Sequence, residues 1–559
     1  MRLVSKITLK FGARPEQAPL ELTPTGITLF VGPNNSGKSL VLREIEKFCA
    51  TNSSEGNHIL QSVDFSLPDA ESLRRDISAS KSAPNQGESV AEGHILVQRI
   101  NTYPGLRQRE IIPLFNVQQW LDTNDLHALC RYYISLLTVR LDGATRTTLL
   151  NPNNRTDLLE PPTNLLSALF VDLDARTRLR KITHAAFGKY FTIDALNSNQ
   201  LRARLSDRLP ADESEEQALD QRAREFHRQA PEITDASDGV KAFTGMAAAV
   251  IGQKSRIPLI DEPEAFLHPP LARRLGKELT EAANRLQASA FIATHSANFL
   301  MGCVAGSPQV NIVRLTFKGG RPSARLLTHD RLQELIKSPL MRSTGVLSAL
   351  FHEGAIVCEG DSDRALYEEI NSRLEAAVPS QGCEAIFVNA HTKQSTAKIA
   401  GPLRQMGIPA AIVIDFDIIN DTEDLKFLLR DLEIPAPLAQ GWCQTKALLV
   451  QQLVASGVDH KRNGLRAILD EGLAGATRSL LKSFEEYGIF VVPNGELESW
   501  QPVAGLQLTN NKKLWLMNAF DALGDNPEAP EYAHPQGDDV WAFLRALAAW
   551  INNPIRAGT

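Results

Sequence analysis

The sequence predicts an α/β protein in two parts, each built on buried strands whose ends carry chemistry. An apolar strand over residues 26–31 leads into a glycine-rich loop and then a helix. A second apolar strand, over 256–260, ends in two adjacent acidic residues. Near residue 350 a strand, a loop and a helix occur again, and the strand over 408–417 carries two further acidic residues at its end. Strands that alternate with helices in this way favour parallel sheets.

The glycine-rich loop predicts a nucleotide site. It matches the G-x-x-x-x-G-K-[ST] phosphate-binding pattern and lies between a strand and a helix, as that pattern requires. Its glycines let backbone N–H groups approach phosphate oxygens. Lys38 is expected to reach the β- and γ-phosphates of ATP, and Ser39 to hold Mg²⁺. The residues expected to bind nucleotide here are Gly32, Asn34, Asn35, Ser36, Gly37, Lys38 and Ser39.

Two later strand ends supply the other residues of the predicted ATPase site. Asp261 is expected to hold Mg²⁺ and Glu262 to polarise the attacking water, because both follow a strand whose end would lie beside the phosphate loop. A strand over 288–294 runs into His295, which could sense or orient the γ-phosphate. The order of these motifs predicts ATP as a cofactor.

At these motifs the sequence resembles the heads of ABC-type ATPases. In that family a Ser-x-Gly signature of one subunit completes the nucleotide site of another, and Ser237 and Gly239 match this signature loosely. The resemblance implies a head-to-head homodimer with ATP between the subunits. Such heads also carry a glutamine loop, for which Gln98, Gln118 and Gln119 are open alternatives.

The second half of the chain predicts an acidic metal site. The apolar strand that begins at Gly354 ends in Glu359, and the apolar strand over 408–417 carries Asp415 and Asp417 at its end. In a strand, residues i and i+2 point to the same side, so both aspartates are expected to face one point. Glu359 joins them if the two strands are neighbours in a parallel sheet. Carboxylates without Cys or His describe a site for Mg²⁺ or Mn²⁺ that suits phosphodiester cleavage.

This pattern resembles the Toprim fold of topoisomerases, primases and some nucleases. The resemblance implies that Glu359 acts as general acid or base and that Asp415 and Asp417 bind metal, with Asp363 as a further acidic ligand. An ABC-type head followed by a Toprim domain is similar to the OLD (overcoming lysogenization defect) family of ATP-dependent nucleases. That family includes the nuclease subunit of the Gabija anti-phage system and effectors of some retrons, and many of its members have Glu where this chain has Asp363.

The tail of the chain extends this likeness. A strand over 487–492 is followed by Glu496 and Glu498. By the resemblance, Glu498 is the candidate for a further metal ligand or water orienter, and Glu496 is its less favoured neighbour. The family also places a basic residue near the scissile phosphate, and three residues remain open for that role: Lys482, Lys512 and Lys513.

The predicted fold class is an ABC-type ATPase head with a helical insertion, followed by a Toprim, Rossmann-like parallel sheet. The expected parts are a split ATPase domain over 1–50 and 236–325, an insertion over 51–235, a connection over 326–349 and a Toprim nuclease domain over 350–559. Within the insertion, residues 51–93 are predicted as a polar loop, 138–150 as a β-hairpin and 165–230 as mostly helical. By resemblance alone, the insertion is expected to supply dimer contacts.

Composition bounds the partners and the compartment. The 559 residues carry a net charge of −6, so a nucleic-acid partner requires a local basic patch. The six cysteines lie far apart without a C-x-x-C pair, which predicts reduced thiols in a cytoplasmic protein. No apolar stretch of about 18 residues occurs, so no membrane-spanning segment is expected.

Together these patterns predict an ATP-regulated, metal-dependent endonuclease in anti-phage defence, acting as a homodimer or higher homo-oligomer. DNA is the expected target, and RNA, including tRNA, stays open. A helicase-like protein, or a retron reverse transcriptase with its noncoding RNA, is the partner that the family resemblance suggests. The alternative is a non-cleaving ATP switch or scaffold that binds nucleic acid or a partner protein. A topoisomerase is disfavoured, because no basic segment surrounds any of the seven tyrosines.

Overall fold

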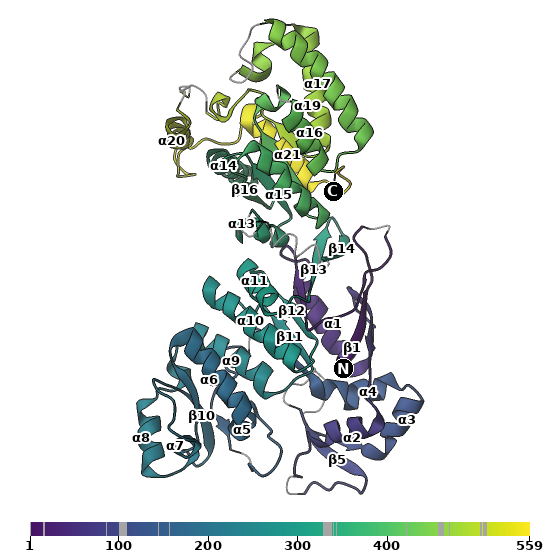
Figure 1. Cartoon of the computed structure of the whole chain (residues 1–559), viewed down its shortest axis with the longest axis vertical. Helices are drawn as coiled ribbons and strands as arrows, with labels where there is room; N and C mark the ends of the chain where they lie inside the picture. The colour runs from purple at the N-terminus through teal and green to yellow at the C-terminus, as the bar shows by residue number, and fades with distance from the viewer. Residues whose placement is uncertain are drawn as a thin grey trace. The chain divides into compact units, whose positions relative to one another are not determined.

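The computed structural model divides the chain into two compact units, which are described separately (Figure 1). The first comprises Met1–Val31, Asn35–Phe317 and Arg321–His329, and the second comprises Gly32–Asn34, Lys318–Gly320 and Asp330–Thr559. The structure describes all residues except 1, 15–16, 85–86, 100–108, 144, 156, 328–337, 339, 342–343, 421, 457–462, 469, 504–505, 507–510 and 559. Within the described residues, no helix has the length and apolarity needed to cross a membrane.

A six-stranded sheet forms the centre of the first unit, in the order β14-β13-β3-β12-β11-β7. The strands from β13 to β7 pair in parallel. They read as continuous apolar runs because both faces of such a sheet are covered by helices. The strands are β3 (Ile27–Val31), β7 (Thr138–Leu141), β11 (Ile257–Asp261), β12 (Ala290–Ala293), β13 (Val310–Lys318) and β14 (Arg321–Leu327), and the adjoining helices include α1 (Lys38–Thr51), α9 (Asp238–Gly252), α10 (Pro269–Arg285) and α11 (Ala297–Gly306).

The predicted hairpin over 138–150 is wrong. Its first strand, β7, pairs in parallel with β11 at the edge of the central sheet, and the described residues after it form turns. The cause is tertiary, since the chain after β7 turns toward the end of β11, where Arg146 donates to the carbonyl oxygen of Asp261, and does not return beside β7. This part of the predicted insertion therefore contributes to the ATPase sheet.

The polar segment 51–93 is more ordered than the predicted loop. It contains β4 (Leu60–Phe65), which pairs antiparallel with β1 (Val4–Leu9), and α2 (Ala70–Ser78). Strand β2 (Glu21–Leu22) completes this three-stranded sheet on the other side of β1. Further along, β5 (His94–Gln98) pairs with β6 (Arg109–Pro113) and is followed by α3 (Val117–Asp122) and α4 (Leu126–Tyr132).

The α4 segment shares its core with the phosphate-loop helix. Leu129, Cys130 and Ile134 belong to the same buried cluster as Val41 and Ile45 of α1. The first half of the predicted insertion thus shares a hydrophobic core with α1, and the domain boundaries 1–50 and 236–325 stay a prediction.

The segment 165–230 is helical only at its ends. Helices α5 (Leu165–Val171) and α6 (Leu173–Phe187) lead into the antiparallel strands β9 (Tyr190–Asp194) and β10 (Gln200–Ser206), with β8 (Asn153–Asn154) beside β10. Helices α7 (Glu213–Gln217) and α8 (Gln221–Gln229) follow. Alternation in β10 explains the pair, because Leu201, Ala203 and Leu205 are buried on one face. On the other face, Arg202 and Arg204 both contact the buried Asp194 at 2.7 Å, so charged side chains of this segment form a partly buried ion-pair network.

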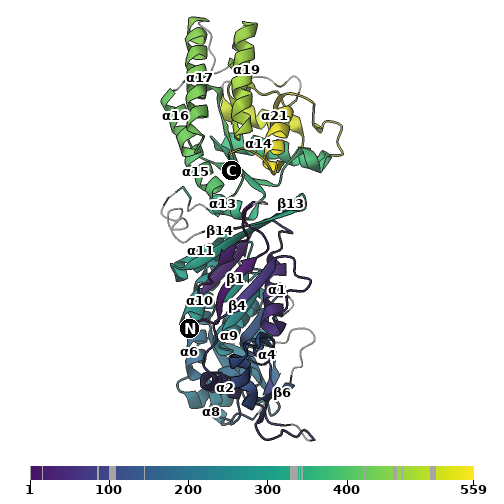
Figure 2. The same ribbon diagram turned by 90° about the vertical axis from the view of Figure 1, so that its right-hand side faces the viewer.

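The second unit is built on a parallel sheet in the order β16-β15-β17-β18. Its strands are β15 (Gly354–Cys358), β16 (Ala385–Asn389), β17 (Ala410–Ile414) and β18 (Ile489–Val491). Figure 2 shows α15 and α16 on one side of this unit and α14 and α21 on the other. The helices are α13 (Thr344–Ser348), α14 (Asp361–Ala377), α15 (Lys393–Gln405), α16 (Thr422–Asp431), α17 (Ala436–Ser456), α19 (Glu471–Glu486), α20 (Lys512–Leu523) and α21 (Asp539–Asn552). This arrangement confirms the predicted α/β fold class.

One buried carboxylate ties the phosphate-loop helix to β4. The side chain of Glu44, in α1, accepts hydrogen bonds from the backbone N–H groups of His58 at 2.6 Å, Ile59 at 3.1 Å and Leu60 at 2.7 Å. We expect Glu44→Ala to lower the local free energy of unfolding by about 3 kcal/mol, because these N–H groups lose their acceptor in a place that water does not reach. Hydrogen exchange as a function of urea, followed in peptides covering residues 38–65, measures this loss. The exposed Glu71→Ala on α2 is the matched control, and equal protection in the two variants would contradict the prediction.

Candidate nucleotide and metal sites

The phosphate loop is held in a shape that only glycine allows at one position. Gly37 precedes α1 with φ 94°, in the left-handed region. A Cβ atom there would also lie 2.6 Å from Cδ1 of Ile59. Lys38 is 5% exposed, and its Nζ donates to Oγ of Ser36 at 3.4 Å. The helix thus begins with its free N–H groups beside the lysine that the sequence assigns to phosphate.

The two predicted Mg²⁺ ligands of the nucleotide site meet. Oγ of Ser39 donates a hydrogen bond to Oδ1 of Asp261 at 3.0 Å. They are brought together because β3 and β11 both flank β12 in the sheet, so their carboxyl ends share one edge. Burial raises the pKa of Asp261, and the nearby charge of Glu262 raises it further. A divalent cation beside this carboxylate would reverse that effect.

Glu262 and His295 also face each other. Nε2 of His295 lies 3.6 Å from Oε1 of Glu262, which has φ 48° and is exposed. Burial, together with the charge of Lys38, lowers the pKa of His295. At neutral pH the imidazole is therefore uncharged and can exchange hydrogen bonds with a phosphate or a water. Its role toward the γ-phosphate stays a prediction.

Two residues that the sequence analysis missed support this edge. Oε1 of Glu264 accepts the backbone N–H of His295 at 2.6 Å, and Nη2 of Arg146 donates to the backbone carbonyl oxygen of Asp261 at 3.0 Å. Glu264 had a signal, because it stands two residues after Glu262 in the run Asp-Glu-Pro-Glu. Arg146 had none, since it lies more than a hundred residues earlier in a segment predicted as a hairpin.

Ser237 and Gly239, which loosely match the Ser-x-Gly signature, lie at the start of α9. Ser237 is the residue before the helix, and a Cβ atom on Gly239 would lie 2.8 Å from the carbonyl oxygen of Phe266. Gly239 is therefore required for close packing within this chain, and its part in a nucleotide site of another subunit stays a prediction. The glutamine loop also stays open, because Gln98 accepts from Arg109 within the β5–β6 pair.

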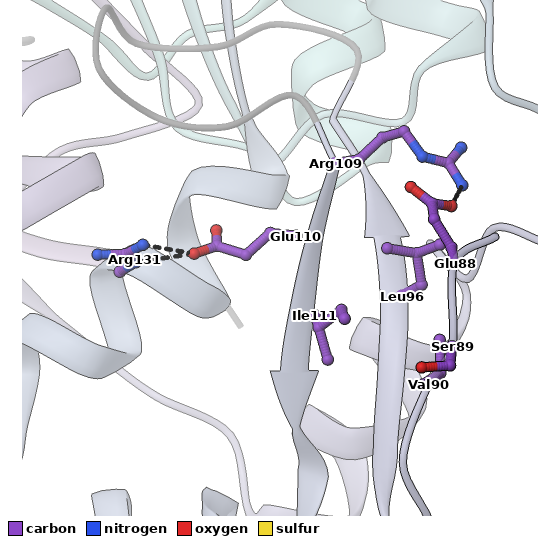
Figure 3. A pocket seen from close by; sticks show the side chains of 8 residues that line it. All are labelled: Glu88, Ser89, Val90, Leu96, Arg109, Glu110, Ile111 and Arg131. Carbon is purple, nitrogen blue, oxygen red and sulfur yellow. Dashed lines mark hydrogen bonds and ion pairs between the residues drawn. The ribbon is translucent and has the colours of Figure 1, made fainter. Parts of the chain in front are cut away.

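A cavity of about 390 Å³ beside β5 and β6 belongs to neither predicted site (Figure 3). Its two arginines are already paired inside it. Arg109 contacts Glu88 at 2.9 Å, and Arg131 contacts Glu110 at 2.6 Å. Because each charge is compensated by its neighbour, the cavity offers little electrostatic attraction to a charged ligand.

In the second unit, the acidic residues gather where the strand order reverses. From β15 the chain moves to β16 on one side and returns to β17 on the other, so the carboxyl ends of β15 and β17 border a crevice. Glu359 follows β15 and Asp415 follows β17, and the two strands pair directly, with Cys358 opposite Val413. The sequence analysis expected Glu359 to join the aspartates if these two strands were neighbours in a parallel sheet, and they are.

Asp417 lies on a different element from the predicted strand. Strand β17 ends at Ile414, and Asp417 lies in a 3₁₀ turn over Phe416–Ile419. The argument from alternation along a strand is therefore wrong here. The turn forms because Phe416 is fully buried and its N–H donates to the carbonyl oxygen of Gly495 at 2.9 Å.

The carboxylates at this edge affect one another's protonation. Burial raises the pKa of Asp415 well above its ordinary value, and the charges of Asp363 and Glu359 add to this. Burial also raises the pKa of Glu359, followed by the charge of Asp417. The charges of Asp363 and Asp417 thus act on both Glu359 and Asp415, which indicates a local concentration of negative charge.

Two lysines place positive charge beside these carboxylates. Nζ of Lys512, at the start of α20, lies 3.0 and 3.1 Å from the two carboxylate oxygens of Asp363. Nζ of Lys393, at the start of α15, lies 3.1 Å from Oδ1 of Asp417 and 3.5 Å from Oδ2 of Asp424. Lys393 had no signal in the sequence, because an isolated lysine before a helix is common on protein surfaces.

The structure distinguishes among the three lysines left open by the sequence. Lys512 contacts the acidic cluster, whereas Lys482 pairs with Glu485 on the exposed face of α19 at 2.7 Å. Lys513 is exposed, and its backbone N–H contacts Asn511 at 3.1 Å. Lys512 is therefore the one whose ammonium group lies at the predicted metal site.

Glu498 and Glu496 also differ. Oε2 of Glu498 is buried without a hydrogen-bond partner, as is Oε2 of Glu359. Glu496 instead forms a capping box with Ser499. Unpaired buried carboxylate oxygens suit hard cations such as Mg²⁺. Over the described residues, however, no three Asp, Glu, His or Cys side chains are grouped closely enough to hold a metal ion as they stand. Carboxylate oxygens are the type of ligand that Mg²⁺ and Mn²⁺ prefer. Two of these carboxylates, Asp363 and Asp417, instead contact lysines in this structure.

Family models match both halves of the chain. Residues 161–301 match the model of an AAA domain described as "putative AbiEii toxin, Type IV TA system". Residues 350–417 match the TOPRIM domain of overcoming-lysogenization-defect-like proteins. The chain combines an ATPase domain with an OLD-like TOPRIM domain. The resemblance to the OLD architecture predicted from the sequence is thereby confirmed.

Individual relatives are more distant. An OLD nuclease of Thermus scotoductus is 27% identical over 177 residues, which is 30% of this chain and 32% of that protein. The matched region therefore spans about a third of that relative's length. Among solved structures, an SMC head bound to the C-winged helix domain of ScpA is 13% identical, with a TM-score of 0.35, over 59% of this chain and 99% of that one. The SMC head domain from Thermotoga maritima is 14% identical, with a TM-score of 0.30, over 59% and 100%.

Repulsion within the acidic cluster predicts an unusual mutational effect. The raised pKa of Asp415 means that the folded state binds a proton more tightly than the unfolded chain, so this carboxyl stabilises the fold only in acid and loses that effect as pH rises. Without divalent cations, Asp415→Asn is expected to raise the free energy of unfolding at pH 8 by about 1–2 kcal/mol. At pH 5 the gain should be smaller, because the raised pKa of Asp415 favours protonation of the parent carboxyl as the pH falls.

Thermal denaturation in EDTA at the two pH values measures this difference. Asp521→Asn, an exposed change on α20, is the matched control. Adding Mg²⁺ should then stabilise the parent and leave Asp415→Asn nearly unchanged, because binding to the native state alone raises stability. If Asp415→Asn is less stable than the parent at pH 8 in EDTA, the prediction is wrong. The Asp415 carboxylate would then make net favourable interactions in the folded state, and repulsion from its neighbours would not dominate.

Proposed function

We propose that this protein is an ATP-regulated, divalent-metal-dependent endonuclease that acts on DNA. One observation carries the proposal: Glu359 and Asp415 directly follow neighbouring parallel strands at one edge of a sheet, where nearby carboxylates raise the pKa of both. Such a cluster is unfavourable for folding and is maintained where a cation and a phosphate are to be bound. The match to the OLD-like TOPRIM model supports this reading.

Each group at this edge has a role in the proposed reaction. Asp415 and Asp417 would hold the metal, with Asp363 and Glu498 as further oxygen ligands. A bound divalent cation neutralises the charge that develops on the scissile phosphate. Glu359, whose raised pKa brings it closer to neutrality, exchanges a proton with the attacking water or the leaving oxygen. Lys512 places a positive charge beside Asp363, where it can contact the phosphate.

The nucleotide site would act as the control element. Lys38 and the start of α1 bind the phosphates of ATP, Ser39 and Asp261 hold Mg²⁺, and Glu262 orients a water. We propose that ATP stabilises a homodimer, with Ser237 and Gly239 of one subunit meeting the nucleotide of the other. ATP then serves as a signal more than as a source of work.

The biological setting follows from the family resemblance. The OLD nuclease of Thermus scotoductus supports a nuclease assignment. We propose a role in anti-phage defence in the cytoplasm, with a helicase-like protein or a retron reverse transcriptase and its noncoding RNA as the two candidate partners.

A non-cleaving ATP switch is the second candidate. It is favoured by the lysine contacts on Asp363 and Asp417 and by the absence, over the described residues, of a ready group of three metal-ligating side chains. Titration calorimetry with Mg²⁺ separates the two functions. Heat that disappears in Asp415→Asn supports the nuclease, and no heat from the Toprim site supports the switch.

Nicking of a supercoiled plasmid in Mg²⁺ or Mn²⁺ tests the nuclease directly. Glu359→Gln keeps the shape of the side chain but removes its proton exchange, so cutting should fall by at least about a hundredfold. Lys38→Ala should abolish ATP binding and with it the effect of ATP on cutting, while leaving the Toprim residues intact. A Glu359→Gln protein that nicks as fast as the parent would reject the assignment.

The lysine choice gives a separate prediction. Lys512→Ala should slow nicking by about tenfold or more, because a charged hydrogen bond to the phosphate is lost in a partly buried place. Lys513→Ala and Lys482→Ala are matched controls that remove the same charge from nearby exposed positions, and both should cut at the parent's rate. Equal losses in all three variants would point to general attraction of DNA instead of a specific contact.

A further inference from the structure

A small cavity opens between α15 and α16, beside the acidic cluster. Its volume is about 300 Å³, which is at the lower end of the range for small-molecule sites. The floor is apolar and includes Ala397, Ile418 and Leu428. The rim is polar and charged, with residues from both helices: Lys393, Gln394, Lys398, Asp424, Arg430 and Asp431. An apolar floor with a polar rim suits a flat ligand that also carries hydrogen-bonding edges.

One wall of the cavity is an exposed aromatic ring. Phe427 is 49% exposed, whereas its helical neighbours Leu425 and Leu428 are buried. The guanidinium of Arg430 lies 4.9 Å from the centre of the Phe427 ring. An open phenyl face beside an arginine is a common platform on which nucleic-acid bases stack.

Lys393 links this cavity to the acidic cluster. Its ammonium group contacts Asp417, in the cluster, and Asp424, in the cavity wall. A strand whose phosphate lay at the cluster would therefore have an adjacent nucleotide within reach of the cavity. Gln394, which donates to Asp424 at 3.1 Å, and Asp424 itself offer hydrogen bonds to the edge of a base.

One positive charge on the rim forms no ion pair with a described carboxylate. Asp424 is compensated by Lys393 and Asp431 by Arg430, at 3.5 and 2.9 Å. Lys398 is exposed and forms no ion pair with any described carboxylate. It therefore stands as the positive charge available to a phosphate that enters along α15.

We propose that this cavity receives one unpaired nucleobase of the strand bound at the acidic cluster, stacked on Phe427, with a flanking phosphate at Lys398. The proposal rests on the proposed nuclease function, and it adds that the substrate is single-stranded at or beside the cut. In a duplex both faces of each base are covered by its neighbours, so the ring of Phe427 could reach only an unstacked base.

Binding of a labelled single-stranded DNA of about 12 nucleotides to the full chain tests the inference. Glu359→Gln is used throughout to prevent cutting, and fluorescence anisotropy is the readout. Phe427→Ala should weaken binding by about tenfold, while Phe427→Trp should preserve it. Leu448→Ala, which also removes an exposed apolar side chain but on α17, is the matched control and should bind normally.

An abasic scan of the same oligonucleotide identifies the base. One position should exist where removal of the base weakens binding by about tenfold in the parent and has almost no further effect in Phe427→Ala. If Phe427→Ala binds as tightly as the parent, or if every abasic penalty is the same in both proteins, the inference is wrong. Complete competition by a free mononucleotide at similar concentration would also overturn it, since the cavity would then serve a free nucleotide.

Failure of this inference is distinct from failure of the nuclease proposal. If the parent cuts and Glu359→Gln does not, while Phe427→Ala binds normally, only the base pocket is rejected. Suppose instead that neither the parent nor any variant cuts, but Phe427→Ala still weakens binding and the matching abasic position is still found. The base pocket is then supported and the nuclease proposal is rejected.

Discussion

Repulsion among buried carboxylates is the constraint on which the second unit depends. The charge of Asp363 raises the pKa of both Glu359 and Asp415, and Glu359 also raises that of Asp415. Asp363 is buried, and Glu359 and Asp415 are partly buried. Such a cluster persists only if the rest of the fold holds it in place. The parallel strands β15 and β17 do this, because their paired backbones hold the first residues after them at one edge.

Two ammonium groups offset part of this repulsion, and each comes from a helix start. Lys393 begins α15 and Lys512 begins α20, so the positive ends of two helices and two side-chain cations surround the acids. The same contacts explain why the acids do not already form a closed ligand set. A cation that enters must compete with lysines for Asp363 and Asp417, which makes the metal affinity of this site a property of the lysines as well as of the acids.

The nucleotide site uses the same architecture with milder electrostatics. Asp261 is partly buried, but Oγ of Ser39 donates to it directly, and Lys38 stands next to Ser39 at the start of α1. Both sites place their chemistry at the carboxyl ends of parallel strands, where the following loops are free to vary and the strands fix their starting points. Both units therefore place their sites at the carboxyl ends of parallel strands, but they differ in the positive groups that lie beside the carboxylates.

The sequence by itself determined the elements whose signals are local. The run from Gly32 to Ser39, the apolar strands and the acids directly after them are each read within a few residues, because a buried parallel strand must be apolar throughout and its end must turn. It could not determine which strands become neighbours, and so it mistook β7 for half of a hairpin and placed Asp417 on a strand. The contacts of Lys393, Lys512, Glu264 and Arg146 were decided only by the tertiary structure, since each joins residues far apart in the chain. Such a contact depends on the packing of whole elements, and no local pattern of residues records it.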